Sequence, residues 1–398
     1  MSRRRVLAAL VGVTLAAVAS TPHPIAGQQA GQAWKFAVSG DSRNCGDVVM
    51  PAIAVTATTN QAAFYWHLGD LRYSQDFDED MKQLPQFKKQ PMSIVQYMRL
   101  EWPDFIEHQI KPFGSMPYYI GIGNHETVFP RTRLDFIQQF GDWLVTPTLK
   151  DQRLKDDPND HMIKTYYHWV QGGVAFYNLD NATEDMFDRA QIGWFNRLLA
   201  KDVADPAVRS IVVGVHSALP DSIAADHSMS DFPVGVETGR AVYKSLLNAQ
   251  NAGKKRVYVL ASHLHNFIDG VYNTAYWRAN GGVLPGWIVG TAGAYRLPLP
   301  AAAAKDAKAA MTMVYGSLIA TVQPDGAIQF DFKRVNEPDV PPSVVTTYGK
   351  EFVHWCFANN TAGRSGAIRM PVARRTRSVA PAIAASTVSG SSQGDSGG

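Results

Sequence analysis

Five apolar, strand-like runs of this sequence each end in side chains that bind divalent metals. The five ends are Gly40-Asp41, Gly69-Asp70, Gly123-Asn124-His125, His216 and His263-Leu264-His265. Carboxylate, amide and phenol oxygens, gathered with imidazole nitrogens at the ends of strands, are the donors of a two-metal hydrolytic site. One such end means little, because Gly-Asp after a strand is ordinary turn chemistry. All five in this order indicate one metal centre.

The order of the five ends and the residues in them resemble the motifs of the calcineurin-like metallophosphoesterases. The second end reads Gly69-Asp70-Leu71-Arg72-Tyr73, which is similar to the form found in purple acid phosphatases. The resemblance covers roughly residues 34–295. It implies a four-layer α/β (α+β) fold, a sandwich of two mixed β-sheets flanked by helices, with the metal site at the carboxyl ends of the strands.

The hydrophobic pattern itself indicates α/β architecture with mixed sheets, because short apolar runs alternate with longer helical patterns. We expect strands near residues 34–40, 63–68, 117–122, 166–170, 174–179, 210–215, 256–261, 286–290, 316–322 and 327–333. We expect helices over residues 46–58, 92–110, 131–140, 188–201 and 237–252. Residues 142–164 are polar and are predicted to form a loop.

The chain divides into three parts. Residues 1–27 combine a basic start with a short apolar run, as a signal peptide does, and their consecutive arginines are typical of the twin-arginine kind; a general secretory signal is the alternative. Residues 28–345 are predicted to form the metallophosphoesterase domain, with residues 74–116 as a cap inserted over the site. Residues 346–398 are a C-terminal segment whose Ser- and Gly-rich tail is predicted to be disordered.

The leader also bears on location and partners. Its apolar run is shorter than the about 20 residues that span a bilayer, so we expect a periplasmic or secreted protein without a stable membrane anchor. Its removal takes away arginines and no acids, which brings the formal charge of +3 to about zero. No stripe of lysines and arginines indicates binding to nucleic acid. The partner that the resemblance implies is a small-molecule phosphate ester. The oligomeric state stays open.

The resemblance implies two metal ions, iron in one site with iron, zinc or manganese in the other. The implied ligands are Asp41 and His265 for the first ion, Asn124, His216 and His263 for the second, and Asp70 as the bridge between them. His263 and His265 are two residues apart, which places both imidazoles on one face of an extended strand end.

The first ion's site departs from the common family pattern. Where most of the family reads Asp-x-His, this chain reads Asp41-Ser42-Arg43, and an arginine cannot ligate a metal. Purple acid phosphatases lack that histidine too and use a tyrosine phenolate instead, at the position where Tyr73 stands. A phenolate ligand favours Fe(III), which lowers its pKa. Arg43 is expected either to bind a phosphate oxygen of the substrate or to neutralise a nearby carboxylate.

The resemblance also implies the reaction, in which a metal-held hydroxide attacks phosphorus and His125 protonates the leaving group. Glu126 is expected either to orient His125 or to be a surface charge. His227 lies in a loop where similar proteins carry a second histidine on the substrate side, with catalytic and substrate-binding roles. An exposed loop histidine is the alternative. His67 is expected to be structural, because strand alternation directs it away from the metals.

Two cysteines, Cys45 and Cys356, leave two possibilities open. In an oxidising compartment they could form a disulfide that ties the C-terminal segment to the loop of the first motif. Two separate buried thiols are the other possibility.

The functional hypothesis is an exported, metal-dependent phosphoric ester hydrolase, most simply a phosphomonoesterase of the acid phosphatase type. A phosphodiesterase acting on nucleotides or lipid head groups is the alternative among enzymes. Outside enzymes, the alternative is a catalytically inactive periplasmic protein that binds metal or a phosphate ligand. A serine hydrolase is disfavoured, because no Gly-x-Ser-x-Gly elbow follows a predicted strand.

Overall fold

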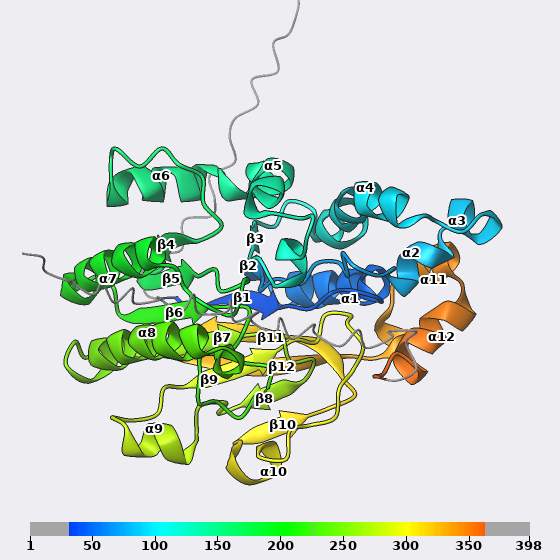
Figure 1. The fold of residues 1–398 in the computed structure, drawn as a ribbon. Helices are drawn as coiled ribbons and strands as arrows, with labels where there is room; N and C mark the ends of the chain where they lie inside the picture. Colours follow the sequence, from blue (N-terminus) through cyan, green and yellow to red (C-terminus); the bar gives the residue numbers. More distant parts are fainter. Residues whose placement is uncertain (1–31, 225, 363–398) are drawn as a thin grey trace, which may run out of the picture.

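Two β-sheets form the centre of the computed structural model, which describes residues 32–224 and 226–362 (Figure 1). The first sheet has five strands in the order β12-β11-β1-β2-β3, and the second has seven in the order β10-β8-β9-β7-β6-β5-β4. The predicted signal peptide, residues 1–27, lies outside the described residues, as do residues 363–398 of the predicted tail.

Both sheets are mixed. The strands of the first are β1 (Trp34–Ser39), β2 (Ala62–His67), β3 (Tyr118–Ile120), β11 (Tyr315–Val322) and β12 (Ile328–Val335). Those of the second are β4 (Tyr167–Gln171), β5 (Val174–Asn178), β6 (Ser210–Gly214), β7 (Arg256–Ala261), β8 (Phe267–Asp269), β9 (Gly286–Val289) and β10 (Ala309–Met311). Strands β1, β2 and β3 run parallel, as do β5, β6, β7 and β9, whereas the outer strands pair antiparallel. The predicted sandwich of two mixed sheets is confirmed.

Helices lie on the outer sides of the sandwich (Figure 1). The α-helices are α1 (Gly46–Thr59), α2 (Glu79–Gln83), α3 (Pro85–Lys89), α4 (Ile94–Phe105), α5 (Arg133–Leu144), α6 (Pro147–Asp156), α7 (Arg189–Ala204), α8 (Pro233–Asn251), α9 (Ala275–Ala279), α10 (Ala303–Asp306), α11 (Pro342–Tyr348) and α12 (Lys350–Ala358). Shorter helical turns are η1 (Ile106–Ile110), η2 (Lys111–Phe113), η3 (His125–Thr127), η4 (Met229–Asp231) and η5 (Glu337–Asp339).

Strand alternation explains why two hydrophobic cores form. In β7, Val257 and Val259 pack into the core shared with α7 and α8, while Leu260 belongs to the core between the sheets. Successive side chains of a strand point to opposite faces, so a strand covered on both faces is apolar throughout. Between the sheets the rings of Phe36 and Phe176 meet edge to face, with centroids 5.3 Å apart. Leu68 and Ile122, which lie just before the turns that carry Asp70 and Asn124, belong to this core.

The expected strands and helices are all present, but several elements were missed. The predicted loop over residues 142–164 is wrong, because α6 lies within it. Its start is encoded locally: Thr146 caps the helix by accepting a hydrogen bond from the Leu149 amide, and Pro147 occupies the first turn. Strands β8 and β10 are only three residues long, which leaves too short a pattern to recognise.

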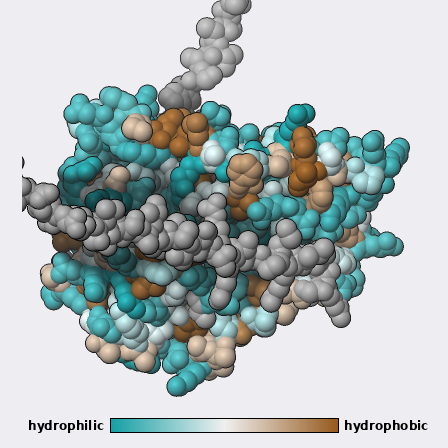
Figure 2. Space-filling model, viewed as in Figure 1, coloured by the Kyte–Doolittle hydropathy of each residue, from teal (hydrophilic) through white to brown (hydrophobic). Residues whose placement is uncertain are grey.

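The face shown in Figure 2 is mainly hydrophilic, with hydrophobic side chains scattered over its upper half. Among the described residues, no helix has the length and apolar character that crossing a membrane requires. Exposed apolar side chains include Ile94, Val95, Leu100, Phe129 and Leu134.

A disulfide joins Cys45 to Cys356, across 311 residues of sequence. Cys45 lies in the loop between the first motif and α1, and Cys356 lies in α12; both are fully buried. Of the two possibilities that the sequence left open, pairing is therefore the one that the structure confirms. The bond fixes the C-terminal helix beside the loop that carries Asp41 and Arg43.

Replacing Cys356 with serine is expected to lower the free energy of unfolding by about 2–5 kcal/mol, because the bond closes a very long loop of the unfolded chain. Chemical unfolding of the oxidised proteins measures this. The Cys45→Ser, Cys356→Ser double variant should lose about the same amount as either single variant, since each removes the same bond. Losses that add up would show that the thiols, and not the bond, stabilise the fold.

Candidate metal centre

Three turns with unusual backbone conformation carry the site. Asp41, Asp70 and His263 follow strands β1, β2 and β7, and their φ angles are 59°, 58° and 64°. Such left-handed conformations are uncommon for residues with a side chain and are typical of functional sites. Hydrogen bonds join the first two turns, from the Asp41 amide to the Gly69 carbonyl and from the Ser42 amide to the Asp70 carbonyl. The backbone therefore fixes where these side chains point.

Four donors converge on one point, and we call Asp70, Asn124, His216 and His263 the four-donor group. His216 Nε2 lies 2.9 Å from Asn124 Oδ1, 3.1 Å from His263 Nδ1 and 3.3 Å from Asp70 Oδ1. Gly123 makes this approach possible, because a Cβ there would lie 2.3 Å from Asp70 Oδ1. The structure thus brings together a predicted bridging residue and the three ligands predicted for the second ion.

The chemistry of these donors fits a divalent cation. His216 Nδ1 lies 3.0 Å from the Leu68 carbonyl, to which it donates, so Nε2 carries a lone pair. That lone pair faces carboxylate and amide oxygens, which are also acceptors, and a cation bound among these atoms would satisfy all of them. The hydroxyl of Ser262, the residue before His263, also donates to the Leu68 carbonyl, at 3.0 Å.

A second group contains the residues predicted for the first ion. His265 Nδ1 donates to the Tyr295 carbonyl at 2.7 Å, and its Nε2 lies 3.3 Å from Asp41 Oδ1. Burial raises the pKa of Asp41 to about 7, with the charge of Asp70 acting in the same direction. Arg43 lies between these residues: its Nη2 is 2.8 Å from His265 Nε2 and its Nε is 3.6 Å from Asp70 Oδ2. An ion bound by Asp41 and His265 would compete with the guanidinium for the same space. These residues therefore fit a metal ion less well than the four-donor group does.

Asp70 connects the two groups. One of its carboxylate oxygens faces the four-donor group and the other faces Arg43. Burial opposes its negative charge, but His216, His125 and Arg43 outweigh burial and hold the pKa of Asp70 below its usual range. The carboxylate therefore stays ionised, as a metal ligand must.

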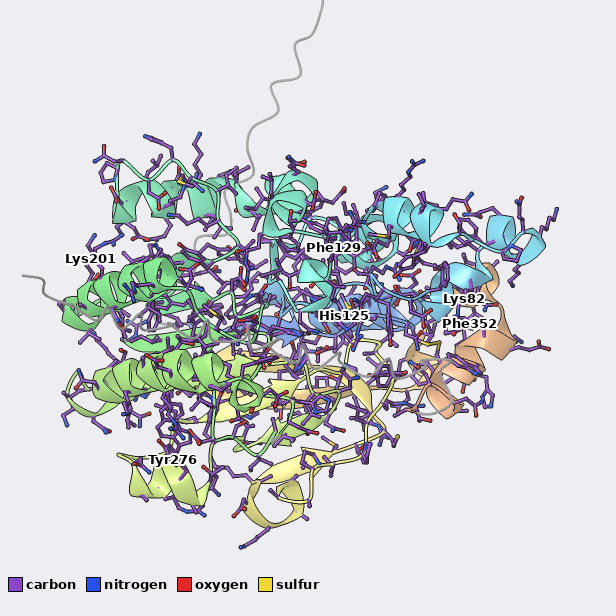
Figure 3. All side chains as sticks on the ribbon, in the orientation of Figure 1. Lys82, His125, Phe129, Lys201, Tyr276 and Phe352 are labelled. Atoms are coloured by element: carbon purple, nitrogen blue, oxygen red, sulfur yellow. A yellow bond between two sulfur atoms is a disulfide. The ribbon has the colours of Figure 1, made fainter. Side chains whose placement is uncertain are left out.

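His125 lies near the middle of the molecule (Figure 3), and its Nε2 points at Arg43. Its Nδ1 donates to the Tyr73 carbonyl at 2.6 Å, and its Nε2 accepts from Arg43 Nη1 at 2.5 Å. Burial, followed by the charge of Arg43, lowers the pKa of His125 to about 4. In this arrangement His125 is a hydrogen-bond acceptor at Nε2, and its predicted role as a proton donor stays a prediction.

Glu126 has neither of the two roles expected of it. It is fully buried, and its carboxylate accepts from the amides of Asp70, Leu71 and Gly123 at 2.7–2.9 Å. Within the described part of the chain no hydrogen bond joins it to His125. Burial and the neighbouring Asp70 charge raise the pKa of Glu126 to about 8. Glu126 therefore links the turn that carries Asp70 to the turn that carries Asn124.

Three further predicted residues lie around the site. The face of the Tyr73 ring is 5.0 Å from the Arg43 guanidinium carbon, and among the described residues no hydrogen bond links its hydroxyl to Asp41 or His265. The side chain of His227 is 35% exposed, and its ring lies 5.6 Å from that of His263, at the edge of the site. His67 is bonded to Ser42 and to the Gly69 amide, in keeping with a structural role.

Two residues of the site were missed by sequence reasoning. The Tyr295 carbonyl orients His265, and its ring lies 5.5 Å from Arg43. Asn181 accepts from the amides of His216 and Ser217, which fixes the turn after β6. The Gly-rich run before Tyr295 was a signal: a Cβ on Gly290 would lie 2.7 Å from Asp41 Oδ2, so the chain passes close to the site there.

Comparison with known proteins gives matches only among solved structures. No family model matches the sequence, and no curated protein matches it. The structure is similar to that of PhoD, with 14% identity over 79% of this chain and 73% of that chain and a TM-score of 0.49. A protein from Staphylococcus aureus, described as a candidate 5′-nucleotidase and solved with α-ketoglutarate, is similar at 11% identity over 76% of this chain and 54% of its own, with a TM-score of 0.39. At this level of similarity neither structure says what the chain does.

Proposed function

We propose that the protein is a metal-dependent hydrolase of phosphate esters, and that its substrates are monoesters. The observation that carries this proposal is the four-donor group, in which ligand atoms of Asp70, Asn124 and His263 face His216 Nε2 at 2.9–3.3 Å. Asp70 and His216 are buried, and the other two residues are partly buried. Bringing unpaired lone pairs together in this way is unfavourable unless a cation lies among them. The group would bind that cation through Asp70, Asn124, His216 and His263.

The surroundings of this group suit a phosphate ester. A divalent cation held there would supply the Lewis acidity that polarises a phosphate and activates water. Arg43 lies on the other side of Asp70, and a guanidinium matches the oxygens of a phosphate group. His125 contacts Arg43, and the ring of His227 lies 5.6 Å from that of His263, so either could bind or protonate the ester oxygen that leaves.

Segments around this centre would set the substrate. Residues 74–116 contain α2, α3 and α4, and we infer that they form a cap beside the site. The loop that carries His227 would contribute the opposite wall.

Export to the periplasm or the medium is part of the proposal. It is supported by the leader-like residues 1–27, whose arginines resemble a twin-arginine signal, and by the disulfide, since such bonds persist in oxidising compartments.

A finer version of the proposal follows from the resemblance to purple acid phosphatases. It places Fe(III) on Asp41, His265 and the Tyr73 phenolate, with iron, zinc or manganese in the four-donor group. A tyrosinate bound to Fe(III) would colour the protein, and Tyr73→Phe would remove the colour. Burial raises the pKa of Tyr73, so without such an ion the phenol stays protonated. The position of Arg43 argues against this version.

Hydrolysis of p-nitrophenyl phosphate in the presence of Zn²⁺ or Mn²⁺ is expected, with its loss on chelation and recovery when the ion is returned. The His216→Ala variant should be at least about 100-fold slower, because altering even the outer partners of metal ligands costs 10–100-fold. His354→Ala is the matched control, since that side chain is 66% exposed and belongs to no site.

Two other outcomes would point to the alternatives. Faster hydrolysis of the bis(p-nitrophenyl) ester would favour a phosphodiesterase. An ion bound tightly in the four-donor group without hydrolysis of either ester would favour a binding protein and contradict the proposal.

A further inference from the structure

We infer that Arg43 takes the place of the first of the two metals, so that the centre consists of one ion in the four-donor group and one fixed guanidinium. The inference rests on the proposed function only in taking that group as the ion's site. It differs from the two-ion centre that the sequence resemblance implies.

The lone pair of His265 decides between the two occupants. Because His265 Nδ1 donates to the Tyr295 carbonyl, Nε2 is its unprotonated nitrogen and has a single lone pair in the ring plane. Arg43 Nη2 lies 2.8 Å from that nitrogen and donates to it. An ion bound by His265 would need the same lone pair. His265 can therefore bind the guanidinium or an ion, but not both.

Two of the three guanidinium nitrogens donate hydrogen bonds, and the third, Nε, makes an ion pair without a hydrogen bond. Nη1 donates to His125 Nε2 at 2.5 Å, and Nε faces Asp70 Oδ2 at 3.6 Å. The rings of Tyr73 and Tyr295 lie 5.0 and 5.5 Å from the guanidinium carbon, within the range of cation–π contacts. Arg43 is only 4% exposed. These contacts make a site that fits the planar guanidinium.

Charge favours the same conclusion. Asp41 and Asp70 are the carboxylates that face this pocket, and together with Arg43 and one divalent ion they leave a small net positive charge that a phosphate can neutralise. A second ion would place two or three further positive charges against the buried guanidinium, where the effective dielectric is low and repulsion is strong.

One feature of the site favours a second ion. Asp41 Oδ1 and Asp70 Oδ2 are buried without a hydrogen-bond donor, and an ion would satisfy both. In the arrangement proposed here bound water, whose O–H groups can donate, supplies that partner.

The number of bound ions tests the inference. Protein saturated with Zn²⁺, desalted and analysed for metal is expected to hold one ion per chain. Arg43→His restores the Asp-x-His pattern, removes the guanidinium and should raise the number to two. Arg43→Lys keeps a cation and should stay at one. Asn124→Ala should lose the ion of the four-donor group, and Asp41→Asn should keep it. Circular dichroism confirms that each variant is folded.

Two ions per chain in the wild-type protein would overturn the inference, as would an Arg43→His variant that still binds one. These results are separate from the fate of the proposed function. A wild-type protein with two ions that hydrolyses p-nitrophenyl phosphate would keep the function and lose the inference. A wild-type protein that binds one ion and does not hydrolyse the ester would support the inference and contradict the proposed function.

Discussion

Replacing Asp70 with asparagine is expected to abolish binding of the ion and to slow hydrolysis by well over about 100-fold. One Asp70 oxygen completes the four-donor group and the other faces Arg43. A neutral amide keeps the shape but removes the negative charge that both cations need. Changing outer partners of metal ligands already costs 10–100-fold, so the loss of a charged ligand should cost more. Metal analysis and p-nitrophenyl phosphate hydrolysis measure the two effects.

This substitution should leave the fold intact. Asp70 has a φ of 58°, and asparagine is among the residues that adopt this left-handed conformation most readily. The turn is also held by the Glu126 carboxylate through the Asp70 amide, which the variant retains. Asp331→Asn is the matched control, because that carboxylate is 59% exposed on β12. Retention of ion and rate in Asp70→Asn would show that the four-donor group is not the metal site.

The hydrophobic pattern predicted α/β architecture with mixed sheets, because strands that are buried on both faces are apolar throughout and end in polar residues. The sandwich itself was implied by the family resemblance. Strands β1, β2, β6 and β7 have the hydrophobic pattern, and each ends in a motif residue.

Parallel strands end at the same edge of a sheet, so Asp41, Asp70 and Asn124 meet at one edge of the five-stranded sheet. His216 and His263 meet in the same way at one edge of the seven-stranded sheet. The packing of the two sheets brings these edges together, as the contact between His216 and Asn124 shows.

Other features depend on contacts between distant segments, which no local pattern encodes. Glu126 accepts hydrogen bonds from amides on two different turns. Arg43 contacts His125 and His265 only in the folded chain, where three loops lie together. The sequence showed that Arg43 could not ligate, but not that it would lie among the ligands. The Cys45–Cys356 bond likewise needs the fold to bring α12 to the first loop.

Arg72, within the second motif, was assigned no role from the sequence, yet it is the centre of a buried cluster of charges. Its guanidinium contacts the carboxylates of Asp47, Asp78, Asp80 and Asp104. All but Asp104 are completely buried, as is Arg72 itself. The cluster joins α1 to α2 and α4, so it anchors these two helices to α1. Asp47, Asp104 and His108 are close enough to hold an ion, but Arg72 already supplies a cation to them.

Replacing Arg72 with methionine is therefore expected to destabilise the protein by about 3–5 kcal/mol, because it leaves several buried carboxylates without a permanent countercharge. That is a large part of the about 5–15 kcal/mol that typically stabilise a domain. Urea unfolding of the metal-free protein measures it. Arg256→Met is the control: its ion pair with Asp325 is half exposed on both sides, so its loss should cost about 0–1 kcal/mol.

The loss in Arg72→Met should also depend on pH. Burial already raises the pKa values of Asp78, Asp80 and Asp104, and removing the guanidinium raises them further. The folded variant then binds protons at pH values where the unfolded chain has released them, so its stability falls as the pH rises through the raised pKa values. The variant should therefore be closer to wild type at pH 5 than at pH 8. An equal deficit at both pH values would mean that Arg72 stabilises the fold through packing and not through its charge.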